Sequence, residues 1–185
     1  YANVDLRTWV PEPMPASAAK PLTLVHAPTH RGVKGTRYVL EAVQRLQEHD
    51  QLNIEFLLVE GLSHEAARRL YRRADVLIDQ LLVGWYGGVA VECMALGKPV
   101  MSYIREADLH FIPAQMRRDL PIIQVTPATL YPVLKEWLTI RRDELQNVGQ
   151  RSRTYVEQWH EPLQIAAQLQ GEYAAILDAQ ASHRP

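Results

Sequence analysis

The sequence has a single cysteine, Cys93, among its 185 residues. One thiol cannot form a disulfide within the chain, so a disulfide framework is excluded, and this sparing use of cysteine is typical of a reducing compartment. Because Cys93 stands among apolar residues, we expect a buried structural thiol rather than a nucleophile.

The sequence also lacks an excess of charge of either sign, long apolar runs and the spacings typical of metal ligands. The formal net charge is −1, which gives no broad electrostatic footprint for a nucleic acid partner. No run of about 18 apolar residues is present, so we expect no membrane span. The seven histidines are scattered, without a His-Glu-x-x-His spacing, so we expect no bound metal. These absences favour a cytoplasmic protein, with peripheral membrane attachment of a full-length form left open.

Proline is concentrated near the start of the chain, at Pro11, Pro13 and Pro15. Such a segment cannot sustain a helix, so we expect residues 1–20 to be a linker or lead-in that runs along the surface without regular structure. The sequence starts at Tyr1 rather than methionine, and we interpret it as a piece of a longer protein. Residues 21–180 then form its folded domain.

Apolar segments of strand length alternate with segments of helical periodicity. Expected strands cover residues 22–26, 54–59, 75–79, 100–104 and 121–125. Expected helices cover residues 36–49 and 64–73, the segment after 85–88, and three stretches from 128 onward, of which the last, 162–179, should dock on the sheet domain. This alternation predicts an α/β fold: a doubly wound, mainly parallel Rossmann-like sheet with added C-terminal helices.

A glycine-rich turn, Gly84-Trp85-Tyr86-Gly87-Gly88, stands between an expected strand and an expected helix. Glycines let a ligand approach the backbone, and a helix N-terminus offers unpaired N–H groups with partial positive charge. The turn therefore predicts an anion site. Glu92 follows one helical turn later, where a carboxylate could accept hydrogen bonds from neutral hydroxyls, so the pattern indicates a nucleotide or a sugar nucleotide.

A second polar turn, residues 27–35, carries Arg31 and Lys34, which we expect as exposed cations suited to a diphosphate. Both turns follow strands at their carboxyl ends and should open onto one crevice, where Asp79 and Gln80 are weaker candidates. The dinucleotide pattern Gly-x-Gly-x-x-Gly is absent after the first strand, and no Gly-Lys-Ser/Thr phosphate loop occurs.

Two segments, VHAPTHRGVKGTRYVLEAVQRL and RRADVLIDQLLVGWYGGVAVECMALGKPVMSYI, resemble the C-terminal donor-binding domain of retaining glycosyltransferases of group 1, or family 4, which have the GT-B fold. The resemblance implies a nucleoside diphosphate sugar as donor, no further cofactor, and an N-terminal acceptor domain that is absent from this chain. It also implies that Arg31 and Lys34 hold the diphosphate and that Glu92 holds the ribose. The amides of Gly87, Gly88 and Val89 would contact the phosphate and the transferred sugar.

The chain departs from the family pattern at Gly84, where a glutamate is often found, and the spacing from Arg31 to Lys34 is shorter than usual. Trp85 and Tyr86 either shape the sugar pocket instead or pack the surface against which a second domain docks. Glu92 itself could pair with an exposed Lys98 and play no part in binding. Two other functions therefore stay open at this point, a sugar-nucleotide epimerase and a non-catalytic binding module.

Overall fold

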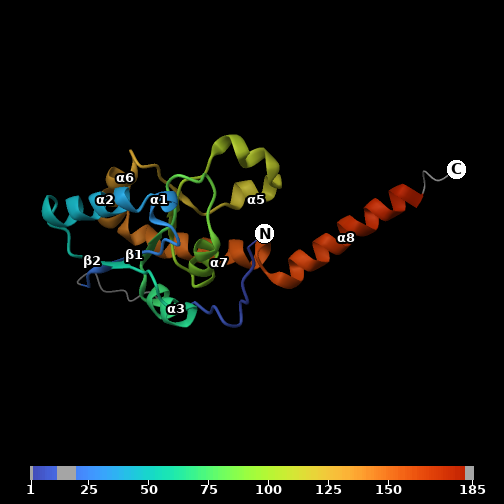
Figure 1. The fold of residues 1–185 in the computed structure, drawn as a ribbon, viewed down its shortest axis with the longest axis horizontal. Helices are drawn as coiled ribbons and strands as arrows, with labels where there is room; N and C mark the ends of the chain where they lie inside the picture. Colours follow the sequence, from blue (N-terminus) through green and yellow to red (C-terminus); the bar gives the residue numbers. More distant parts are fainter. Residues whose placement is uncertain (1, 12–19, 182–185) are drawn as a thin grey trace.

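The computed structural model of the chain describes residues 2–11 and 20–181. Its centre is a parallel sheet with the strand order β2-β1-β3-β4-β5 (Figure 1). The strands are β1 (Leu22–His26), β2 (Ile54–Leu58), β3 (Val76–Ile78), β4 (Val100–Ser102) and β5 (Ile123–Gln124). The α-helices are α1 (Arg31–Lys34), α2 (Thr36–Glu48), α3 (His64–Arg73), α4 (Gly88–Ala95), α5 (Ala114–Asp119), α6 (Leu130–Thr139), α7 (Leu145–Trp159) and α8 (Pro162–Ala181).

The sheet confirms the predicted α/β class with a Rossmann-like arrangement. β1 pairs in parallel with β2 on one side and β3 on the other, with Leu24 opposite both Phe56 and Val76. All five residues of β1 are buried, as expected when helices cover both faces of a parallel sheet. The strand order reverses between β1 and β3, so the crevice for a ligand is expected outside the carboxyl ends of these two strands.

The helices form one apolar cluster on each face of the sheet. On one face, α2 and α6 pack together and bury Val39, Leu46 and Leu134. On the other face, α4 packs against α7 and buries Met94 and Tyr155. The central helix α4 is thus fixed from both sides, by the sheet and by α7, which makes its N-terminus a rigid platform.

The polar turn after β1 is more ordered than expected, because it contains the short helix α1. His30 caps its start by accepting the Val33 N–H, at 3.4 Å from N to Nδ1. Gly35 ends it in the left-handed region, at φ 76°, where glycine is the favoured residue. Likewise, the polar crossover after β4 contains a 3₁₀ helix, Glu106–Phe111, followed by α5.

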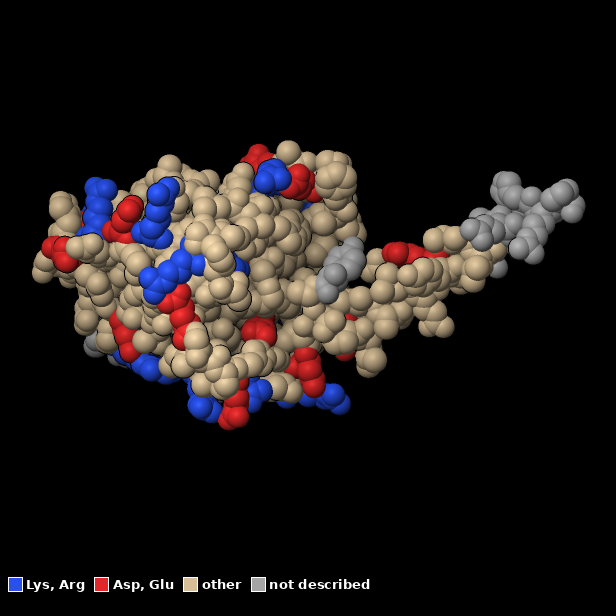
Figure 2. Space-filling model, viewed as in Figure 1, with Lys and Arg blue, Asp and Glu red and all other residues tan. Residues whose placement is uncertain are grey.

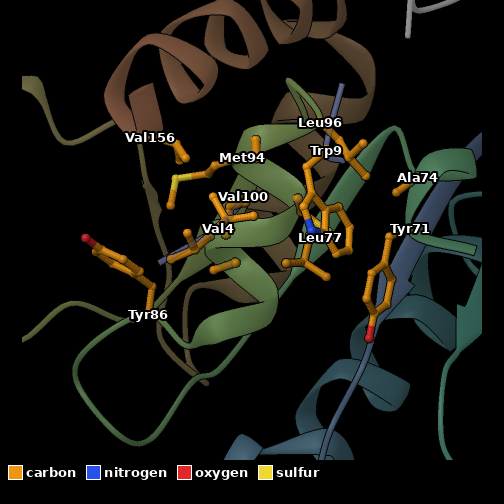
Figure 3. Close-up of a cluster of buried hydrophobic side chains, with 14 of the residues drawn as sticks. Val4, Trp9, Tyr71, Ala74, Leu77, Tyr86, Met94, Leu96, Val100 and Val156 are labelled. Atoms are coloured by element: carbon orange, nitrogen blue, oxygen red, sulfur yellow. The ribbon is translucent and has the colours of Figure 1, made fainter. Parts of the chain in front are cut away.

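The described part of the lead-in lies at the surface as expected, but it is attached to the core, which was not expected. Residues 2–11 contain no helix or strand, as predicted, but Val4 and Trp9 are buried and belong to the same apolar cluster as α4 (Figure 3). Hydrogen bonds hold this segment to the end of α7, with the Val4 N–H donating to the His160 carbonyl at 3.1 Å. Two apolar side chains are sufficient to attach the segment to the core without any periodic pattern. The rest of the expected linker, residues 12–19, lies outside the described residues.

The expectation that the last helix docks on the sheet domain is wrong. α8 projects away from the rest of the chain (Figure 1). Its apolar residues Leu163, Tyr173, Ile176 and Leu177 are exposed. α8 meets the domain near its start, where it contacts α7 and where Ile165 and Leu169 line a small hollow together with Met116 of α5.

The surface fits the near-neutral charge of the chain. Figure 2 shows Lys and Arg interspersed with Asp and Glu on the face in view, without a broad basic patch. Among the described residues, none of the helices is both long enough and apolar enough to cross a membrane.

Candidate functional site

The site lies at the carboxyl ends of β1 and β3, where the strand order reverses. The chain leaves β1 into α1, and it leaves β3 into the glycine-rich turn that starts α4. A backbone hydrogen bond from the Leu81 N–H to the Lys34 carbonyl, 3.2 Å long, ties the two connections together. The fold therefore brings the two predicted turns side by side.

Lys34 and Asp79 form the centre of this site. The Lys34 ammonium lies 2.6 Å from Asp79 Oδ1. The other oxygen, Oδ2, accepts the Gly87 N–H at 2.6 Å. Lys34 is buried, so the expectation of an exposed loop cation is wrong, and the reason is the buried carboxylate that α1 covers. Asp79, a weak candidate from the sequence, is the residue that joins the two turns.

The N-terminus of α4 faces open space. Gly87 is its N-cap and has no side chain with which to cap it. Within the described part of the chain, the amides of Gly88 and Val89 have no hydrogen-bond acceptor. A Cβ added at Gly88 would meet nothing within 4 Å. Two unpaired N–H groups at the positive end of a helix, next to open space, are suited to an anion.

Arg31 lies at the rim of the crevice and binds a carboxylate of the protein itself. Its guanidinium donates to both oxygens of Glu60, from Nε at 2.8 Å and from Nη2 at 2.5 Å. This pairing lowers the pKa of Glu60 and raises the pKa of Arg31. Arg31 and Lys34 thus share one short helix but not one partner. The sequence analysis did not identify Glu60, since nothing local to residue 60 marks it.

Glu92 lies in the second turn of α4, and its carboxylate accepts a hydrogen bond from His64 Nε2 at 2.7 Å. His64 is the first residue of α3 and is largely exposed. Lys98, the surface partner considered as an alternative, is not exposed but buried, at 4% accessibility. The pairing of Glu92 with His64 was missed because the two residues meet only through the packing of α3 beside α4.

The first three residues of the glycine turn, Gly84, Trp85 and Tyr86, are buried or partly buried. Gly84 has φ 90°, and a Cβ there would come within 3.0 Å of the Arg105 Cβ, so a side chain is disfavoured on both counts. Tyr86 is buried, and its hydroxyl lies 2.9 Å from both the Tyr155 hydroxyl and His160 Nε2. Tyr86 thus packs within the core of this domain, which is neither the sugar pocket nor the docking surface that the sequence suggested. Trp85 is partly buried against the same cluster.

Two buried titratable groups lie behind the crevice. His26 Nδ1 lies 2.7 Å from the Ile78 carbonyl, and its Nε2 lies 2.9 Å from the Thr36 hydroxyl. Burial lowers the pKa of His26 and raises the pKa of Cys93 well above its usual value. Cys93 is therefore a protonated core thiol, as expected. Among the described residues, no group of three or more His, Cys, Asp or Glu side chains is placed to hold a metal ion.

Comparison with solved structures shows the class of fold. The chain superposes on a sucrose-phosphate synthase from Thermosynechococcus elongatus with a TM-score of 0.65 and 18% identity, over 96% of this chain and 52% of that one. It superposes on Anabaena HepE, solved in complex with UDP-glucose, with a TM-score of 0.64 and 14% identity, over 95% of this chain and 56% of that one. This chain therefore spans about half the length of these two proteins.

A third structure is matched over its whole length. It is the C-terminal domain of a group 1 glycosyl transferase, LpcC, from Francisella tularensis, with a TM-score of 0.56, 16% identity and coverage of 86% of this chain. The chain thus has the Rossmann-like fold of a domain found in GT-B glycosyltransferases. No protein-family model matches the sequence. A search of curated proteins also finds no match.

Proposed function

We propose that this chain is the donor-binding half of a glycosyltransferase that transfers a sugar from a nucleoside diphosphate sugar, with retention, to an acceptor bound mainly by an N-terminal domain. One observation carries the proposal. The Lys34 ammonium and the unpaired amides of Gly88 and Val89 converge beside open space at the strand-order reversal. Cation and helix N-terminus together suit a diphosphate.

In this proposal the residues of the chain act on the leaving group. Negative charge grows on the diphosphate as the bond to the sugar breaks, and Lys34 and the α4 amides stabilise it from fixed positions. Arg31 at the rim adds a second cation when it exchanges Glu60 for phosphate oxygens. Glu92, one helical turn behind the amides, accepts hydrogen bonds from the ribose hydroxyls. No general base is required from this half.

The structures of HepE with UDP-glucose and with UDP support the nucleotide class and make UDP the first ligand to test. The measurement is calorimetric titration of the chain with UDP, GDP and ADP, each beside its nucleoside. We expect a diphosphate to bind at least about tenfold more tightly than its nucleoside, since charge-assisted hydrogen bonds are among the strongest.

Arg31→Ala is the variant that tests the phosphate contact without disturbing the core, since the side chain is 60% exposed. We expect a loss of roughly tenfold in diphosphate affinity and little change for the nucleoside. Arg141→Ala is the matched control. Arg141 makes the same two-bond pairing, with Glu144, at 2.9 and 2.6 Å, but in the segment between α6 and α7. If Arg31→Ala and Arg141→Ala change the diphosphate affinity by the same factor, the result counts against the proposal.

One observation favours a second candidate, a non-catalytic sugar-nucleotide-binding module. The position where the family often has a glutamate is Gly84, and the Arg105 side chain fills the space that a side chain at 84 would need. A carboxylate contact to the sugar is therefore missing at this point. Product analysis of the full-length protein with a bound donor separates the three candidate functions. A glycosyltransferase releases nucleoside diphosphate as it transfers the sugar, a binding module releases none, and an epimerase returns an isomerised donor.

A further inference from the structure

Asp79 occupies an unusual place for a buried carboxylate. It follows β3 directly, and its own N–H donates to the Met101 carbonyl of β4 at 2.9 Å, so its backbone is fixed in the sheet. Its side chain has no solvent exposure. One oxygen binds the Lys34 ammonium and the other binds the Gly87 N–H, each at 2.6 Å. Both partners belong to the candidate phosphate site, and neither is adjacent to Asp79 in the sequence.

The two partners of Asp79 would otherwise repel each other. The N-terminus of α4 carries partial positive charge, so a lysine ammonium beside it is unfavourable. Yet Lys34 Nζ lies so close that a Cβ on Gly87 would come within 2.8 Å of it. A carboxylate between them offsets this repulsion and restrains a lysine side chain that otherwise has four rotatable bonds.

From this geometry we infer that Asp79 is a positioning residue: it holds the Lys34 ammonium against the α4 N-terminus so that both can bind one diphosphate. The inference rests on the proposed function for the identity of the ligand. The bridge leaves the neighbouring amides of Gly88 and Val89 unpaired, so a phosphate oxygen can bind beside the carboxylate rather than replace it.

The first test needs no ligand. In Asp79→Asn the ammonium loses its charged partner, so Lys34 should react several times faster with an amine-acetylating reagent, as followed by peptide mass spectrometry. Asp75→Asn is the matched control, because Asp75 is also buried and also accepts a backbone N–H, from Thr23 at 2.7 Å, at the opposite end of β3. If Lys34 reacts at the same rate in Asp79→Asn as in the wild type or in the control, the inference is wrong whatever the ligand is.

The second test measures UDP and uridine affinities for the same variants. We expect Asp79→Asn to lose about tenfold or more in UDP affinity with little change for uridine, and Lys34→Met to cost little more when added to it, because coupled residues are not additive. A rise in UDP affinity in Asp79→Asn would show that Asp79 competes with the phosphate. Equal losses of affinity for UDP and uridine would show that its role is structural. Either result overturns the inference. A wild type that binds UDP no better than uridine would reject the proposed function, and the acetylation result would still decide whether Asp79 holds Lys34.

Discussion

Glu92 is partly buried, with 23% of its side chain exposed, and its carboxylate is already oriented by His64. In the proposed function this carboxylate binds the ribose, because the ribose is attached directly to the diphosphate in a nucleoside diphosphate. The pairing with His64 adds a second group at the same rim that the sequence did not suggest.

Glu92→Gln keeps the shape of the side chain but removes its charge. We expect ribonucleotide affinity to fall roughly ten- to hundredfold, since charge-assisted hydrogen bonds contribute about 1.5 to 3 kcal/mol. Analogues without the 2′ and 3′ hydroxyls should lose much less. Titration calorimetry with both ligands gives the answer, with Glu157→Gln in α7 as control. Equal losses for the two ligands would return Glu92 to a surface role.

Gly88 is a residue at which binding and stability can be separated. Alanine is a better helix former than glycine by about 1 kcal/mol, and a Cβ at this position meets no atom within 4 Å. Gly88→Ala should therefore unfold at the same urea concentration or a higher one, while its methyl group hinders an anion at the α4 N-terminus. We expect weaker UDP binding in Gly88→Ala and unchanged binding in Gly171→Ala, where the added Cβ is equally unhindered.

At the scale of elements, Lys34 changes the expectation for the basic pair. The sequence predicted that removing either cation would hardly affect the fold, and this stays the prediction for the exposed Arg31 alone. Removal of Lys34 leaves the buried Asp79 without its cation, and breaking a buried pair in this way typically costs about 3 to 5 kcal/mol. Binding data on Lys34→Ala therefore need a matched stability measurement.

His26 joins three elements, β1, the end of β3 and the start of α2, through its two ring nitrogens. Its pKa in the fold lies below its ordinary value of 6.5, chiefly because of burial. The unfolded chain then takes up a proton near pH 6.5 that the folded chain does not. Stability is complete above that pH and is lost as the pH falls through and below it, by up to about 1.4 kcal/mol per pH unit for each such histidine.

Urea unfolding at pH 7.5 and 5.5 checks this prediction. The free energy of unfolding should be lower at pH 5.5, and His26→Gln should reduce the difference between the two pH values. It should not abolish the difference, because burial also lowers the pKa of His160. Paired carboxylates such as Glu60 stabilise the fold throughout this window and lose that contribution only as the pH falls below about 4.5, because their pKa values are lowered in the fold. If the free energy of unfolding is the same at pH 7.5 and 5.5, the lowered pKa of His26 is contradicted.

Trp9 attaches the N-terminal segment to the core. It is 4% exposed, its ring stacks 6.5 Å from Tyr71, and its carbonyl accepts the Arg153 guanidinium at 2.6 Å. Trp9→Ala should cost about 3 to 5 kcal/mol of unfolding free energy, as expected for removal of a large buried aromatic side chain. Val10→Ala, at a residue 51% exposed, should cost little. Similar unfolding midpoints for the two variants would show that the segment is only loosely attached.

At the scale of the whole molecule, the chain covers about half of the sucrose-phosphate synthase and HepE chains that share its fold. If an N-terminal domain supplies the acceptor site, the chain by itself should bind UDP yet transfer no sugar. Calorimetry and chromatographic detection of released UDP from UDP-glucose measure the two properties separately. Steady release of UDP by this chain alone would place a complete active site within these residues.

The amino-acid pattern was enough to predict the class of fold and to bring two turns, at the ends of β1 and β3, forward as the candidate site. Apolar strands alternating with amphipathic helices leave a parallel doubly wound sheet as the arrangement that buries both, and the glycine turn marks where a helix begins at a strand end. The helix α2 was predicted within one residue of its observed range, Thr36–Glu48. These features depend on local periodicity and on turn residues, and both can be read directly from one sequence.

Which side chains meet at these two turns depends on how the elements pack against one another. Asp79 joins Lys34 to Gly87, Glu60 binds Arg31 and His64 binds Glu92. The three side-chain pairs join residues 28 to 45 positions apart, and Asp79 and Gly87 are eight positions apart. The burial of Trp9 and the projection of α8 were likewise beyond reach. Both depend on which surfaces the rest of the fold presents, and a sequence pattern specifies an apolar stripe without specifying what covers it.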